Sequence, residues 1–454
     1  MRPRLHWALG ERTVVEMQTH WADKAVQLLV LLALVAGLTA CAEDSTVGRR
    51  LRYIPRRIQT EARSRLPHPN YVPTPDLVAD EMTPQVTVLI EADPQPAYTP
   101  APDHTPTAST SAAPDVVPAL PTPTLLPASP SPMPSPTAPP TPTLLPLPPA
   151  TLLTGFSHAW QTWNNCGPAT LAMNLSYFGR PETQADTATV LKPDEDDKNV
   201  SPYELVAYAR SLGFEAIDRV GGNVEMLKRL LSLGIPAIAE TWITPKPNDG
   251  MGHYRLLIGY DDIAGEFVAF DSYFGPNTRL PYDQFDVEWR IFNRTYVLVY
   301  TPDQGELVRR ILGDALDDRT MYQAALATAQ NEAEQNPDDP FAWFNIGSNL
   351  TALGRYDEAA TAYDRARRLG LPWRMLWYQF GPFQAYFAVG RYDDVLTLAA
   401  ANLRNAGNLE ESHYWRGRAL EALGRTEEAR RAFEKALRFN PNYVAAKQAL
   451  AALQ

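Results

Sequence analysis

A loop that leads directly into a helix is predicted by the run Gln161-Thr-Trp-Asn-Asn-Cys166-Gly-Pro168-Ala-Thr170. Pro168 suits a first helical position, where a backbone N–H would have no intrahelical acceptor. Apolar residues then recur at helical spacing, and Gly179 suits a left-handed end of the helix. Cys166 is therefore expected at the N-terminus of this helix.

A cysteine in that position is a candidate nucleophile. Unpaired N–H groups and the helix dipole favour a thiolate there. Gln161, on the same loop, can turn an amide N–H toward the sulfur as an oxyanion donor. The chain has only two cysteines, Cys41 and Cys166. If Cys41 carries a lipid, Cys166 has no disulfide partner within the chain, and a buried structural thiol is the alternative to a reactive one.

The N-terminal segment has the pattern of an export signal. An apolar run from Val26 to Leu38 is too short to cross a bilayer of about 30 Å, and it ends at Leu38-Thr-Ala-Cys41. This ending resembles a bacterial lipobox. We therefore expect residues 1–40 to be a lipoprotein signal peptide, with lipidated Cys41 anchoring an exported protein to the outer face of the bacterial cell membrane. A plain signal peptide or an interfacial helix is the alternative, and Met17 competes with Met1 as the start.

Residues 41–152 are expected to form the anchor region and a disordered linker rich in Pro and Thr. Residues 101–150 contain 17 prolines and almost no charge, so they cannot bury enough apolar surface to offset the entropy of ordering. Such a segment favours polyproline II and predicts a spacer. The formal net charge of −11 argues against a nucleic-acid partner, because phosphate binding requires a basic face.

Residues 153–302 are expected to form an α+β domain, because helices come first and antiparallel strands follow. The acidic loop 194–197 is expected to be a solvated turn. Ser201-Pro-Tyr-Glu204 is a capping-box helix start. The remaining predicted elements are a helix from it to Gly213, strands at 214–220, 235–241, 252–260, 266–271 and 295–300, and helices at 223–233 and 282–289.

Residues 306–454 contain an internal repeat. The pattern Gly354-x-Tyr356 returns as Gly390-x-Tyr392 and Gly424-x-Thr426, at intervals of 36 and 34 residues. An aromatic residue, Tyr363 or Phe433, follows the first and third copies at matching positions, and Ala325 to Pro337 looks like the end of a degenerate earlier copy. This pattern resembles the tetratricopeptide repeat, an all-α solenoid. The resemblance implies a protein or peptide partner in the concave face, or a rigid cap on the neighbouring domain.

A thiolate nucleophile requires a base, and two histidines lie inside the α+β region. His158 is too close in sequence to reach back to Cys166 without a tight fold-over, whereas His253 begins a predicted core strand. Asp271 ends the next strand, where an antiparallel pair brings it beside the imidazole. Asp261 and Asp262 compete for this orienting role but fall in the predicted turn.

The order Gln, Cys, His, Asp resembles the papain-like cysteine peptidases of the bacteriocin-processing type, family C39, over residues 155–300. The resemblance implies Cys166 as nucleophile, His253 as general base and acid, Asp271 as orienting carboxylate, and Gln161 with the Cys166 N–H as oxyanion donors. No cofactor is expected, and the two cysteines of the chain are too few for a structural zinc site. The transporter-fused members of the family carry membrane spans and an ATPase, whereas this sequence has no Gly-Lys-Ser/Thr phosphate loop. Cleavage of leader peptides inside the cell is therefore not expected.

Two functions follow from these patterns. The first is a membrane-anchored, extracytoplasmic cysteine peptidase that hydrolyses a peptide or amide bond through an acyl-thioester, with the repeats recruiting a protein substrate or partner. The second is a non-catalytic cell-surface adaptor that uses both domains as binding scaffolds. Trp160, Trp163, Trp242 and Tyr273 are candidates for a substrate groove, although aromatic residues in such numbers more often belong to a core.

Overall fold

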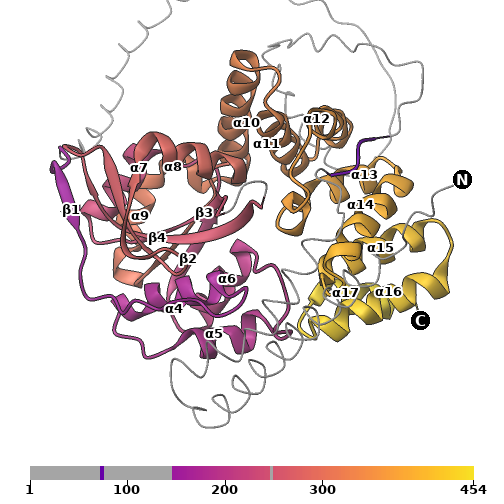
Figure 1. Ribbon diagram of the computed structural model, residues 1–454, viewed down its shortest axis with the longest axis horizontal. Helices are drawn as coiled ribbons and strands as arrows, with labels where there is room; N and C mark the ends of the chain where they lie inside the picture. The colour runs from indigo at the N-terminus through magenta and orange to yellow at the C-terminus, as the bar shows by residue number, and fades with distance from the viewer. Residues whose placement is uncertain (1–71, 76–145, 246–248, 454) are drawn as a thin grey trace, which may run out of the picture. The chain divides into compact units, whose positions relative to one another are not determined.

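The computed structural model describes residues 72–75, 146–245 and 249–453, which belong to one compact unit (Figure 1). The proposed signal segment, Cys41 and nearly all of the predicted linker lie outside the described residues. Within the described residues, no helix is long and apolar enough to cross a membrane.

The centre of the α+β region is an antiparallel sheet. Its strands follow the order β2-β7-β3-β4-β5-β6, and the short strand β1 also pairs with β4. The bounds are β1 Ala150–Leu152, β2 Glu215–Arg219, β3 Ala237–Ile243, β4 Met251–Asp261, β5 Glu266–Asp271, β6 Gly275–Pro281 and β7 Tyr296–Tyr300. β3 is buried along its whole length, since helices cover both faces of the sheet.

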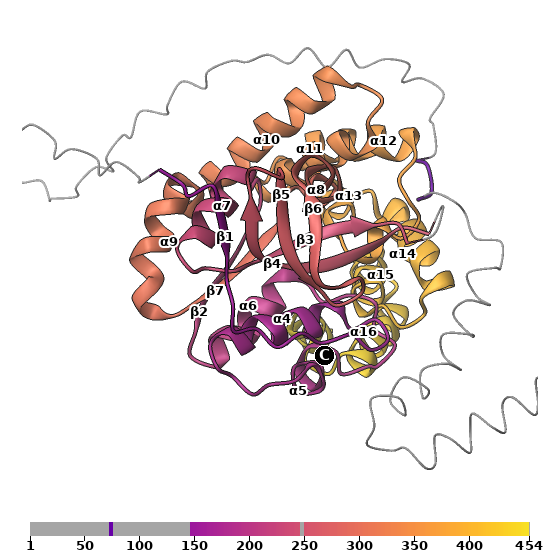
Figure 2. The ribbon, with the colours of Figure 1, turned by 60° about the vertical axis from the view of Figure 1, so that its left-hand side comes forward.

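Two groups of helices cover opposite faces of the sheet (Figures 1 and 2). Helices α4 (Cys166–Tyr177), α5 (Gln184–Leu191) and α6 (Pro202–Ser211) pack on one face through a cluster that includes Leu171, Leu205 and Leu256. Helices α7 (Val224–Ser232), α8 (Tyr282–Trp289) and α9 (Gly305–Leu312) cover the other face through Leu227, Phe285 and Val308. The start of the predicted repeat region, α9, thus packs on the sheet.

The sequence-based elements agree with this structure, apart from details at α4, α5, β1 and β6. Strand β1, at residues 150–152, corrects the expectation of a disordered linker up to residue 152. Helix α4 begins at Cys166, so Pro168 is its third residue rather than its first, while Gly179 does adopt a left-handed φ of 73° after the helix ends. Helix α6 has the predicted capping box between Ser201 and Glu204. Helix α5 and strand β6 were not predicted, because their patterns are short and mixed in polarity.

The C-terminal region is a series of paired helices, as the repeat predicts. The pairs are α11 (Pro340–Ala352) with α12 (Tyr356–Leu369), α13 (Gly381–Ala388) with α14 (Tyr392–Asn405), and α15 (Glu410–Ala422) with α16 (Thr426–Phe439); α10 (Asp318–Gln335) precedes them and α17 (Val444–Ala452) follows. Gly354, Gly390 and Gly424 turn each pair with φ between 73° and 78°. A Cβ at Gly347 would lie 2.7 Å from the Tyr363 ring, so this glycine is required for close helix packing.

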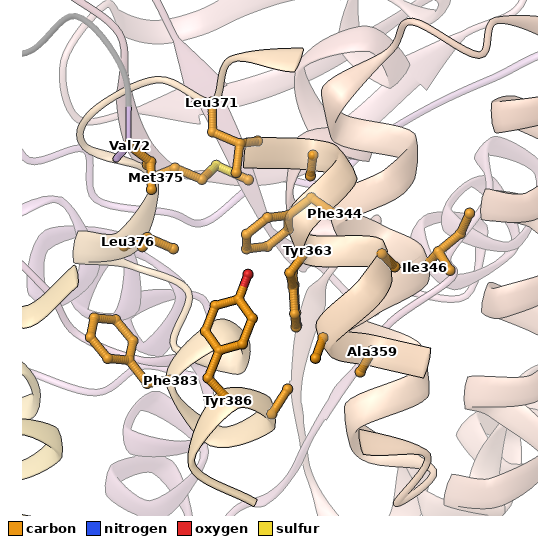
Figure 3. Packing of buried hydrophobic residues seen from close by; sticks show 14 of the residues in the cluster. Val72, Phe344, Ile346, Ala359, Tyr363, Leu371, Met375, Leu376, Phe383 and Tyr386 are labelled. Atoms are coloured by element: carbon orange, nitrogen blue, oxygen red, sulfur yellow. The ribbon is translucent and has the colours of Figure 1, made fainter. Parts of the chain in front are cut away.

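Residues 72–75 pack against the repeats, which corrects the expectation of an unstructured linker for these four positions. Val72 is buried beside Leu371 and Met375 (Figure 3), and its N–H donates to the Leu371 carbonyl. The buried Arg367 side chain donates to the Pro73 carbonyl at 2.7 Å. These four residues therefore belong to the same folded unit as the repeats, and not to the predicted spacer.

The α+β region and the repeats share one hydrophobic core. Trp242, Ile291 and Phe292 belong to the same buried cluster as the core of the repeat helices. The side-chain amides of Asn293 and Asn349 also bond reciprocally, at 2.7 and 3.2 Å. Fully buried amide pairs of this kind fix one relative orientation, because a shift would leave polar groups without partners. The repeats thus extend the core of the α+β region.

Candidate active site

The loop before Cys166 is held from the neighbouring helix α5. Asn164 adopts a left-handed φ of 49°, which asparagine tolerates better than most residues. The Gln184 side chain accepts from the Thr162 N–H and the Asn165 amide, both at 2.9 Å, and donates to the Trp160 carbonyl at 2.7 Å. Three points of the loop are therefore fixed by one side chain.

A buried lysine holds the same loop from the end of α5. Lys192 Nζ donates to the carbonyls of Trp163, Asn164 and Glu195 at 3.0 to 3.3 Å. Burial lowers the pKa of Lys192, although nearby Asp197 and Cys166 act to raise it. This ammonium group consequently adds positive potential near the sulfur and orders the carbonyls that precede the helix.

The predicted strand pair brings His253 and Asp271 together. In the antiparallel register of β4 and β5, Arg255 lies opposite Asp271, and His253 is two residues away on the same face. His253 Nε2 lies 2.9 Å from Asp271 Oδ1, and both side chains are buried. The other imidazole nitrogen, Nδ1, is left for Cys166. This is the arrangement in which a carboxylate orients a histidine beside a thiol.

Asp271 is held as an ionised carboxylate. Burial alone would raise its pKa, but His253, the N–H of Phe274 and Arg255 together lower it. Its Oδ1 accepts the backbone N–H groups of Tyr273 and Phe274 at 2.7 and 2.9 Å, and its Oδ2 accepts from Arg255 Nε at 3.1 Å. A carboxylate with this many donors does not need to take a proton from the imidazole.

The electrostatics favour a thiolate and an imidazolium. Burial raises the pKa of the Cys166 thiol, but the hydrogen bond and charge of His253 and the N–H of Tyr254 more than offset this, so the pKa is lowered. Burial lowers the pKa of His253, whereas Asp271 and Cys166 raise it to about 9. Cys166 is partly exposed as a residue and lines a pocket, so the activated thiol lies beside a cavity.

Arg255 is a site residue that the sequence analysis missed. Its guanidinium bridges Asp271 and Glu288, and the side chain is only 4% exposed. Because strand residues alternate between faces, a charged residue two positions after His253 in a buried strand was an available signal. Gln184 and Lys192 gave no such signal, since their bonds to loop carbonyls and amides follow no sequence period.

Gln161 and His158 both lie near the end of β5. Gln161 Oε1 accepts from the Ser272 hydroxyl at 2.8 Å, and its backbone N–H donates to the Ser272 carbonyl. This leaves the Nε2 amine as the remaining donor of the side chain, and its role at an oxyanion stays a prediction. His158 Nε2 bonds to the backbone carbonyl of Asp271 at 2.9 Å, so this histidine is engaged away from the sulfur.

The remaining candidates, the competing aspartates and the aromatic residues proposed for a groove, lie at different places in the fold. Asp261 accepts from turn N–H groups, and Asp262 pairs with Lys228 at 2.8 Å, so neither bonds to His253. Trp242 belongs to the core shared with the repeats, whereas Trp160 and Tyr273 are 46% and 39% exposed. Across residues 72–75, 146–245 and 249–453, no cluster of His, Cys, Asp and Glu could hold a metal ion.

The acidic loop is the expected solvated turn at Glu195 and Asp196, but not at Asp197. Asp197 is only 2% exposed, and Asn199 Nδ2 donates to Glu411 of α15 at 2.9 Å. At the edge of this contact, Asn408 Nδ2 donates to Asp194 Oδ1 at 3.1 Å. Helix α15 of the repeats packs on this end of the loop. The sequence does not reveal which surface a distant helix will cover.

A pocket opens beside the sulfur. It is lined by residues of the α4 loop, of β3 and β4, and of the repeats: Asn164, Cys166, Gly167, Lys198, Asn199, Val200, Glu240, Gly252, His253, Tyr254 and Tyr378. Its cavity volume is about 20 Å³, enough for about one water molecule. The candidate nucleophile and base thus share a narrow pocket with one residue of the repeats.

Comparison with known families covers the two regions separately. Residues 154–297 match the Peptidase_C39 like family, and residues 312–370 and 410–443 match tetratricopeptide repeat families. No curated protein matches the chain.

Solved structures similar to the chain also fall into two groups. A C39-like peptidase from Bacillus anthracis is 18% identical, covers 34% of this chain and 98% of its own, and gives a TM-score of 0.28. The peptidase domain of Streptococcus ComA is 20% identical, covers 32% and 98%, and gives 0.27. MamA from Desulfovibrio magneticus RS-1 is 22% identical, covers 33% and 84%, and gives 0.28.

The family matches coincide with the two regions that the fold distinguishes. Residues 154–297 enclose the sheet, α4 and the Cys166, His253 and Asp271 cluster. The chain carries a papain-like domain of the Peptidase_C39 like family, followed by tetratricopeptide repeats.

Proposed function

We propose that the chain is a cysteine peptidase that hydrolyses a peptide or amide bond through an acyl-thioester. The observation that carries this proposal is the position of His253, which bonds to Asp271 through Nε2, lines the same pocket as Cys166 and lowers the pKa of its thiol. A structural cysteine would not require a buried imidazole, a buried carboxylate and an arginine arranged in series behind it.

In the first step, the Cys166 thiolate attacks the carbonyl carbon of the scissile bond. A C–S bond forms while the carbonyl electron pair moves to the oxygen. The backbone N–H of Cys166 has no intrahelical acceptor at the first position of α4, so it is available to the oxyanion, together with the Gln161 amide. His253 then gives its proton to the leaving nitrogen, the C–N bond breaks, and an amine departs from the acyl-thioester.

In the second step, water hydrolyses the thioester. Neutral His253 takes a proton from the attacking water, the new C–O bond forms, and the C–S bond breaks to release a carboxylic acid. The thiolate and imidazolium are restored. Asp271 remains ionised throughout and stabilises the imidazolium, since its bonds to Arg255 and two backbone N–H groups maintain its charge.

The location and partner form a second part of the proposal. The lipobox-like sequence ending at Cys41 supports export and lipid anchoring at the outer face of a bacterial membrane. Tetratricopeptide repeats suggest protein–protein interaction, so we propose that they recruit a protein substrate or partner. The core that the repeats share with the peptidase domain supports a fixed placement of that partner relative to Cys166.

A non-catalytic adaptor remains the second candidate function, because the repeats alone suffice for binding. An active-site-directed thiol probe distinguishes the two functions on the full-length chain, with labelled peptides mapped so that Cys41 is excluded. We expect Cys166 to react at pH 6 to 7, and His253→Ala to slow its labelling by roughly 10²–10³-fold. His413→Ala is the matched control, because His413 is a buried repeat histidine bonded to the Gly407 carbonyl. Equal labelling in wild type and His253→Ala would refute the peptidase.

A further inference from the structure

Glu240 is a buried carboxyl group in the pocket that holds the sulfur. It lies on β3, directly opposite Tyr254 of β4, and the next residue, Thr241, lies opposite His253. The residue is 6% exposed and lines the same pocket as Cys166 and Gly252. None of the proposed hydrolytic steps uses it.

The carboxyl group has no partner among the described residues. No hydrogen bond or ion pair in residues 72–75, 146–245 and 249–453 reaches its oxygens, although Thr241 and Tyr254 beside it are both bonded. Burial raises the pKa of Glu240 well above its ordinary value, and the negative charges of Cys166 and Asp218 raise it further. A buried polar group that faces a pocket without a partner is costly, unless a ligand supplies the partner.

The cation that lines the same pocket is engaged elsewhere. Lys198 Nζ lies 5.9 Å from the centre of the Trp163 ring and donates to the side-chain oxygen of Asn164 at 2.8 Å. Its pKa is lowered to about 8, mainly by burial, with Asp196 acting to raise it. Lys198 therefore belongs to the loop before Cys166 and leaves the Glu240 carboxyl without a counter-charge.

Tyr378 of the repeats supplies an aromatic wall to this pocket. Its ring lies 3.1 Å from the position that a Cβ would take at Gly252, so a side chain there would press against the ring. Tyr378 also packs edge-to-face on Trp242 and Phe292, in the core shared by both regions. The wall is therefore held in place by the shared core.

We propose that this pocket binds the primary ammonium group of a lysine side chain of the substrate, close to the scissile bond. The group would pair with the Glu240 carboxylate beside the Tyr378 ring. A volume of about one water molecule suits an ammonium head better than the larger, planar guanidinium of arginine. A carboxylate with an aromatic ring is a common environment for a bound cation.

This inference rests on the proposed function and names its substrate class. The Glu240 carboxyl gives up its proton when the ammonium group binds, so no net charge is buried. The repeats then contribute to substrate selection directly, through Tyr378, in addition to any partner that they recruit.

The test uses the full-length chain and peptides that differ at one position. A lysine is moved through the positions around a cleavable bond, and at each position it is compared with norleucine, Nε-acetyl-lysine and arginine. We expect one position at which lysine raises kcat/KM at least about 10-fold over the other three. Glu240→Gln, which keeps the shape, should reduce that ratio to about 1, whereas Glu434→Gln, an exposed glutamate of α16, should leave it unchanged.

Each outcome has one meaning. No cleavage of any peptide together with no His253-dependent thiol labelling would refute the peptidase itself. Cleavage with equal rates for lysine and acetyl-lysine at every position would refute the ammonium subsite and keep the peptidase. The comparison of lysine with acetyl-lysine needs only the wild-type protein. The proposal can therefore be tested even if Glu240→Gln does not fold. A lysine preference that persists in folded Glu240→Gln would also overturn the proposal.

Discussion

Two clusters of buried carboxyl groups in this protein have opposite charge states. At the candidate active site, Asp271 is fully buried and has its pKa lowered, because His253 and Arg255 outweigh the cost of burial. At the contact between the acidic loop and α15, burial and mutual repulsion raise the pKa of Asp197 and of Glu410 well above their ordinary values. The two clusters contain similar groups at similar depth.

The difference lies in the cations and not in the burial. Asp271 has an imidazole and a guanidinium within 3.1 Å, whereas the acids at the α15 contact bond mainly to the neutral amides of Asn199 and Asn440. Lys192 acts on Asp197 only through its charge, since its Nζ is used on three carbonyls. The carboxyl group of Asp271 thus favours its charged form, whereas Asp197 and Glu410, at the contact with α15, favour their protonated forms.

The largest effect is expected from removing the charge of Asp271, which pairs with His253 and Arg255. Asp271→Asn keeps the shape but removes the charge that orients His253, so peptide cleavage should fall by roughly 10²–10⁴-fold. The pH profile also tests the cause. With its pKa at about 9, the wild-type His253 imidazolium is lost as pH rises through 9. Because Asp271 raises this pKa, Asp271→Asn should shift the alkaline limb of labelling or cleavage to lower pH.

Asp261→Asn is the matched control for this prediction. Asp261 competed for the same role in the sequence, but it accepts turn N–H groups at Ile263 and Ala264. We expect it to leave both the rate and the alkaline limb unchanged. Equal losses in the two variants would mean that Asp271 acts through the fold rather than through His253.

An intermediate effect, on the pH dependence of stability, is expected from Glu411 at the contact between the acidic loop and α15. The pKa of Glu411 is raised to about 8 by burial and by Asp197. A raised carboxyl pKa contributes stability below the unfolded value of about 4.5, and this contribution is lost as pH rises toward 8. Glu411→Gln removes this loss and keeps an oxygen for Asn199. Its melting temperature relative to wild type should therefore increase by at least about 2 °C between pH 5 and pH 8.

Thermal unfolding followed by circular dichroism measures this difference. Glu434→Gln serves as the control, because Glu434 is exposed on the neighbouring helix α16. A Glu411→Gln difference that is the same at both pH values would show that the contact does not hold its protons. The carboxyl groups at the α15 contact would then not differ from Asp271 in charge state.

The sequence predicted the places of Cys166, His253 and Asp271 in the fold. Cys166 follows from helix-end chemistry, and Asp271 follows from His253 because a two-strand antiparallel pair fixes which residues lie side by side. Gln184 and Lys192 could not be predicted, since a side chain that bonds to a loop carbonyl has no periodic pattern. Tyr378 and Glu411 lie in the repeats, and only the packing of those repeats on the sheet brings them to residues 252 and 199.

The smallest effect tests whether the pH dependence belongs to the buried acids or to the whole contact. Asn408 donates to Asp194 at 3.1 Å at the edge of the same contact, where the side chains are partly exposed. Asn408→Ala removes one hydrogen bond and should lower the free energy of unfolding by about 0.5–1.5 kcal/mol. Because no buried carboxyl loses its environment, the loss measured by denaturant titration should be the same at pH 5 and pH 8. A loss confined to pH 8 would place the titrating groups at the edge of the contact and would remove the reason for contrasting it with Asp271.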